Sequence, residues 1–112
     1  DSPHLQVAIT APEPPTGDAT VFVVARPPGG GMPYAAVRRP AAMLPFTVLL
    51  DDLVSMSEQR VLSAAEQFEV VVRLSRSGTA QAQSGDWVWR SGPLNGQDYA
   101  AGKKLHATLK SP

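Results

Sequence analysis

Cysteine is absent from this chain of 112 residues. Without a thiol, the chain cannot form a disulfide, a zinc–thiolate site, a thiolate nucleophile or a covalent attachment to haem. A blue-copper site is excluded as well, because that site requires a cysteine sulfur. The missing cysteine therefore removes several classes of redox and metal-binding protein from consideration.

An excess of either charge and a long apolar run are also missing. The chain has 10 basic and 10 acidic residues. A nucleic-acid-binding protein normally carries a basic patch that displaces counterions from phosphates, so this balance predicts no nucleic-acid partner. No apolar stretch approaches the roughly 20 residues that a transmembrane helix requires. We expect one domain over residues 1–112, long enough to bury a modest core.

Short stretches of alternating residues dominate what the chain does contain. In the stretch from Phe68 to Ser75, every second residue is apolar, which predicts a strand with one apolar face. Thr20 to Arg26 is apolar on both faces, which is typical of a central strand covered on both sides. The stretch from Ser75 to Asp86 has no such period and is interpreted as a polar connection.

Weaker alternation predicts further strands at Leu5–Thr10, Tyr34–Arg38, Phe46–Leu50, Trp87–Trp89 and Lys104–Lys110. Eleven prolines and nine glycines supply turns between them, and we interpret Ser91–Pro93 and Asn95–Gly96 as turns. A capping-box spacing at Ser55 and Glu58 allows a short helix between Leu53 and Gln67. Together these patterns predict an all-β fold, an antiparallel β-sandwich of about six or seven strands with room for one short helix.

Catalytic residues are not indicated anywhere in the sequence. No serine, histidine and aspartate have a spacing that identifies a hydrolase, and Asp51 and Asp52 are adjacent, so on a strand they would point to opposite faces. We therefore expect no enzymatic activity and no cofactor.

Two histidines and three methionines leave a metal site open as an alternative. His4 and His106 lie near opposite ends of the chain, and imidazole together with a thioether such as that of Met56 suits copper. The preferred interpretation is that both histidines are solvated and that the methionines fill the core or loops. A copper-carrier domain stays as the alternative.

Trp87 and Trp89 are two residues apart and point the same way from an extended chain. The first interpretation is that they cover one end of the core, because large aromatic side chains are mostly buried. The second is an exposed aromatic surface on which a peptide docks, with Arg90 and Tyr34 as further candidate partner-binding residues. A third possibility is a structural spacer without a partner.

Three blocks of sequence are similar to one known family. They are VFVVARPPGGGMPYAAVRR at Val21–Arg39, LPFTVLLDD at Leu44–Asp52, and VVVRLSRSGTAQAQSGD at Val70–Asp86. In order and separation they resemble the C-terminal periplasmic domain of the CcmI/CycH family of cytochrome c-type biogenesis proteins. The chain departs from the family pattern at Val72, at Ala82 and in the aromatic Trp87–Trp89 segment.

The resemblance implies a non-catalytic binding or accessory domain in cytochrome c maturation, one that acts as a chaperone helping to present apocytochrome c to the haem-ligation complex. It implies a periplasmic location, with attachment to the inner membrane through parts of the chain that are not present in this sequence. The partners that it implies are apocytochrome c, other subunits of the haem-ligation complex, and a helical-repeat domain of the same chain. It transfers no ligand residue.

Overall fold

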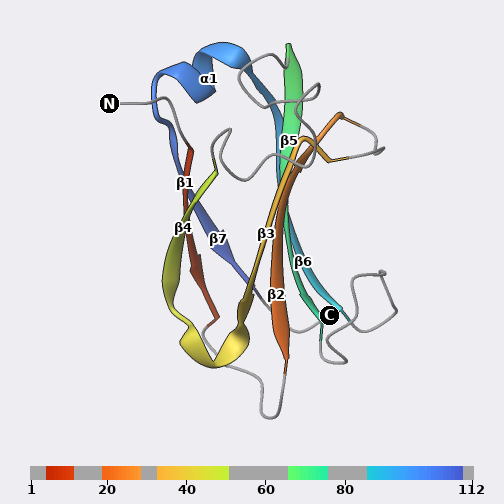
Figure 1. Ribbon diagram of the computed structural model, residues 1–112, viewed down its shortest axis with the longest axis vertical. Helices are drawn as coiled ribbons and strands as arrows, with labels where there is room; N and C mark the ends of the chain where they lie inside the picture. The colour runs from red at the N-terminus through yellow and green to blue at the C-terminus, as the bar shows by residue number, and fades with distance from the viewer. Residues whose placement is uncertain (1–4, 12–18, 29–32, 51–65, 76–85, 110–112) are drawn as a thin grey trace.

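The computed structural model describes residues 5–11, 19–28, 33–50, 66–75 and 86–109 (Figure 1). Within these ranges the chain forms seven β-strands, one turn of 3-10 helix and one short α-helix. The strands are β1 Leu5–Thr10, β2 Thr20–Arg26, β3 Ala35–Pro40, β4 Phe46–Leu50, β5 Gln67–Ser75, β6 Trp87–Asn95 and β7 Lys104–Thr108. The 3-10 turn is Ala41–Met43, and the α-helix, α1, is Gly96–Ala100.

The strands form two sheets that face each other (Figure 1). The smaller sheet has the order β4-β1-β7, and the larger has the order β3-β2-β5-β6. All pairings in the larger sheet are antiparallel, whereas β1 runs antiparallel to β4 and parallel to β7. The prediction of an all-β sandwich is confirmed, and the β1–β7 pair is the exception to its antiparallel strands.

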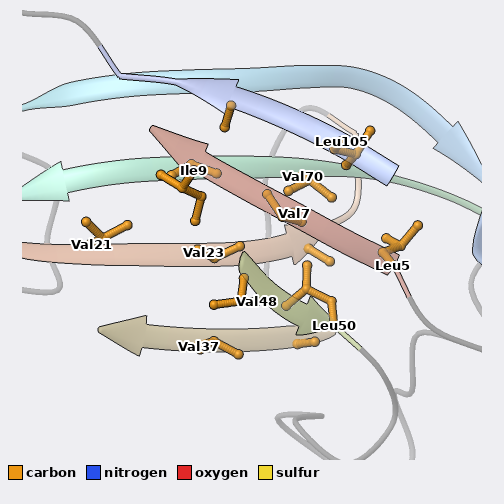
Figure 2. Close-up of a cluster of buried hydrophobic side chains, with 14 of the residues drawn as sticks. Leu5, Val7, Ile9, Val21, Val23, Val37, Val48, Leu50, Val70 and Leu105 are labelled. Carbon is orange, nitrogen blue, oxygen red and sulfur yellow. The ribbon is translucent and has the colours of Figure 1, made fainter. Parts of the chain in front are cut away.

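The core lies between the two sheets and is built from every second residue of their strands. Figure 2 shows Val7 and Ile9 of β1 among side chains of the opposite sheet, including Val23 of β2 and Val70 of β5. The strand predicted for β5 is confirmed, but its burial does not alternate, because Glu69, Val71 and Ser75 on the other face are buried as well. Its inward-facing residues, Phe68, Val70, Val72 and Leu74, have no exposed surface.

The second half of β6 is a strand, so the predicted turn at Ser91–Pro93 is wrong. Opposite Val70, β6 carries two residues instead of one, and the register shifts there as in a β-bulge. Ser91 Oγ accepts a hydrogen bond from the Val70 N–H at 3.0 Å and donates one to the Gly92 carbonyl at 2.8 Å. Gly92 has φ +78°, a conformation that glycine adopts without strain.

The predicted turn at Asn95–Gly96 is the start of α1 instead. The Asn95 side chain accepts hydrogen bonds from the N–H groups of Gln97 and Asp98, and Asp98 accepts one from the Asn95 N–H, which completes a capping box. The short helix predicted between Leu53 and Gln67 falls mostly on residues outside those that the structure describes. No helix in the described part of the chain is long and apolar enough to cross a membrane.

We predict that Ser91→Ala lowers the free energy of unfolding by about 1–3 kcal/mol, because the Val70 N–H then loses its hydrogen-bond acceptor in a partly buried place. Urea denaturation followed by circular dichroism measures this change. Thr108→Ala removes a hydroxyl from an exposed strand position and serves as the control. An equal, small effect of both substitutions would contradict the role assigned to Ser91.

Candidate functional site: an arginine-lined apolar groove

The outer face of the larger sheet, the face turned away from the core, has apolar side chains at its centre. It carries the residues that alternate with the core residues, among them Phe22 and Val24 of β2, Val71 of β5 and Val88 of β6. An antiparallel sheet normally presents polar side chains on such a face. No helix or strand among the described residues packs over it.

This face is hollowed into a groove of about 660 Å³. All four strands of the larger sheet contribute to it, and each described lining residue is either apolar or an arginine. The lining residues are Phe22, Val24, Arg26, Pro33, Ala36, Val37, Arg38, Val71, Arg73, Val88 and Arg90. The sequence pattern predicted two apolar faces for β2, and the second of these faces is the floor of the groove.

Two of the four arginines in the groove are held by carboxylates. Arg73 Nη1 lies 2.7 Å from Asp86 Oδ2, and both side chains are largely buried. The same guanidinium stands 4.8 Å from the centre of the Phe22 ring, in a cation–π arrangement. Arg26 Nε lies 3.0 Å from Glu69 Oε1. These contacts hold both side chains against the sheet and keep their stems packed on the floor of the groove.

The other two arginines, Arg38 and Arg90, are exposed. Among the described residues, neither forms an ion pair. They project from β3 and β6, the two edge strands, and therefore stand on opposite sides of the groove. In the strand register, Arg38 lies opposite Phe22, and Arg90 lies opposite Val71.

The outer face of the smaller sheet shows that this composition is specific to the groove. Its residues alternate with those of the core in the same way, but most of them are polar. They are Gln6, Ala8 and Thr10 of β1, Thr47 and Leu49 of β4, and Lys104, His106 and Thr108 of β7. The apolar floor with arginines around it is thus a property of one face of the sandwich.

The two tryptophans lie on the inner side of β6, facing the core. Trp87 is 8% exposed, and Trp89 is partly buried against the core cluster. They pair with Leu74 and Val72 of β5, whose side chains point inward. The positions match the first interpretation, in which the indoles cover the core. Trp87 is too buried to form the exposed aromatic surface of the second.

The two remaining candidate residues for partner binding, Arg90 and Tyr34, lie in different places in the structure. Arg90 lies in the groove, whereas Tyr34 precedes β3 and packs, half-buried, against the core. Sequence reasoning missed Phe22, Val24, Arg38 and Arg73 as site residues. The available signal is the pair of apolar faces of β2, which is also typical of a strand covered on both sides.

The copper alternative receives no support from residues that the structure places together. Among the described residues, no three histidine or acidic side chains are close enough to hold a metal ion. His106 is exposed on β7, and His4 and Met56 lie outside the described residues.

The described residues that line the groove offer apolar surface and guanidinium groups, and none of them has a side chain used for nucleophilic or general-base chemistry. Guanidinium groups recognise carboxylates through paired N–H donors, and arginine is enriched among the residues that dominate binding energy. The arrangement is suited to binding a ligand that is apolar in part and negatively charged in part.

The profile of the Ig-like domain of cytochrome c-type biogenesis protein H matches residues 4–105 of this chain. The chain belongs to this family. The resemblance noted from the three sequence blocks is thereby confirmed, and an Ig-like domain agrees with the observed two-sheet sandwich.

A curated CycH-family relative is the cytochrome c-type biogenesis protein CycH of Pseudomonas aeruginosa, which is 46% identical to this chain over 79 residues. The match covers 70% of this chain and 19% of the relative, so the chain spans about a fifth of the length of that protein. No solved structure matches the chain significantly.

We predict that Trp87→Ala lowers the free energy of unfolding by about 3–5 kcal/mol, because it removes a large buried side chain and leaves a cavity. Val88→Ala, one residue further on and 48% exposed, should change it by roughly 0.5 kcal/mol or less. Urea denaturation followed by far-ultraviolet circular dichroism compares the two. If Trp87→Ala were as mild as Val88→Ala, the indole would not be part of the core.

Proposed function

We propose that this chain is a non-catalytic, periplasmic binding domain in cytochrome c maturation, which helps to present apocytochrome c to the haem-ligation complex. The assignment to cytochrome c maturation rests on membership of the cytochrome c-type biogenesis protein H family. The groove on the larger sheet favours binding over catalysis, because the described residues that line it are apolar or cationic and include no nucleophile or general base.

The partners that we propose are apocytochrome c, the other subunits of the haem-ligation complex and the helical-repeat domain of the parent protein. The parent protein would be anchored in the inner membrane by segments outside this sequence. The chain corresponds to about a fifth of its curated relative, so this domain would act beside others in the same protein. A sandwich with a groove on one sheet suits such a role, because a site built on paired strands requires little reordering on binding.

The test is a titration of this protein with a fluorescent apocytochrome c peptide that contains the Cys-x-x-Cys-His segment, and separately with purified haem-ligation subunits. We expect saturable binding to at least one of them with a Kd in roughly the micromolar range. A peptide of the same composition in scrambled order is the control. If no partner binds above this control, the domain is a structural spacer and the proposal fails.

A further inference from the structure

The geometry points to a specific occupant of the groove: an amphipathic α-helix of a partner protein, with an apolar stripe and carboxylates along both sides of that stripe. This inference rests on the proposed function, because it names the chemistry that a partner in that pathway would present.

The floor offers part of its apolar surface to solvent. Phe22 and Val24 of β2 are half-buried and Val88 of β6 is 48% exposed, whereas Val71 of β5 is buried between them. Burying apolar surface on both faces is the usual reason for a strand such as β2 to be apolar on both sides. In the described part of the chain, only the inner face is covered by another layer. An apolar stripe on a partner would cover the outer one.

The charge of the groove selects an acidic partner. It contains four arginines, and two carboxylates, Glu69 and Asp86, are paired with two of them. Arg38 and Arg90 have no such pairing among the described residues. The whole chain has equal numbers of basic and acidic residues, so this positive excess is local to the face. Local charge of one sign steers and orients a partner of the opposite sign.

The positions of the two exposed arginines favour a helix over an extended segment. β3 and β6 are separated by three strand spacings, which places Arg38 and Arg90 about 14 Å apart across the sheet. An α-helix with its side chains is roughly 10–12 Å in diameter, so it fits between them and covers the floor. A single extended strand occupies only about 5 Å of that width and would leave apolar floor exposed on either side.

Two synthetic helices test the inference. Each has about 16 residues and the same leucine stripe at i, i+3, i+4 and i+7, and the stripe is flanked by glutamate in one and by lysine in the other. Fluorescence anisotropy measures their binding to this protein. We expect the glutamate helix to bind at least roughly tenfold more tightly than the lysine helix, with the difference shrinking between about 50 and 300 mM salt.

Protein variants locate the binding to the groove. Arg38→Glu and Arg90→Glu should each weaken the glutamate helix several-fold, and the double variant should bind the lysine helix better than the unmodified protein does. Lys104→Glu makes the same charge reversal on the outer face of the smaller sheet and should have little effect. Val88→Asp should weaken binding at least about tenfold, whereas Leu49→Asp, at a similarly exposed position on β4, should not.

Equal binding of the two helices, or equal effects of Val88→Asp and Leu49→Asp, would overturn the inference. Circular dichroism of each variant confirms that it is folded. The same variants also separate this inference from the proposed function. If apocytochrome c or a haem-ligation subunit binds and is unaffected by Arg38→Glu, Arg90→Glu and Val88→Asp, the function stands and the groove is not its site. If only the glutamate helix binds, the groove stands and the pathway assignment fails.

Discussion

The pairing of β2 with β5 is the constraint on which both the core and the groove depend. In this register Val23 lies opposite Val72, and Val24 lies opposite Val71. Successive side chains of a strand point to opposite faces, so a slip of one residue would exchange the inward and outward sets. The inner face of the paired strands β2 and β5 therefore contributes to the core, and their outer face contributes to the groove. A partner bound to the outer face would contact the central strands of the fold and not a peripheral loop.

Strands whose own residues alternate clearly could be predicted from the sequence. β1 and β5 have one strongly apolar face, and their bounds were close to those observed. The second half of β6 could not be predicted, because serine, glycine and proline in succession indicate a turn when they are considered locally. It stays in the sheet because Ser91 bonds the Val70 N–H and because Leu94, opposite Phe68, is buried.

The candidate site was harder to predict than the fold. Alternation separates the residues of β6 into two sets but does not say which set faces the core. The tryptophan set faces inward because its partners on β5 are core residues, and this leaves Val88 and Arg90 outside. The four arginines of the groove come from four different strands, so only the sheet order and register bring them to one face. In the sequence, Arg90 is a candidate binding residue only because it follows the two tryptophans. Its place in the groove follows from the sheet register.

The parallel pairing of β1 with β7 ties the first described strand to the last. Gln6 lies opposite Lys104, and the Leu109 N–H bonds the Thr10 carbonyl at 2.8 Å. β1 is therefore the middle strand of its sheet, yet one of its two neighbours is synthesised only after the rest of the sandwich. Contacts this distant in sequence close late and slowly in folding. Before β7 is synthesised, β1 has no partner for one of its edges, and an unpaired strand edge of this kind is a surface through which chains can associate.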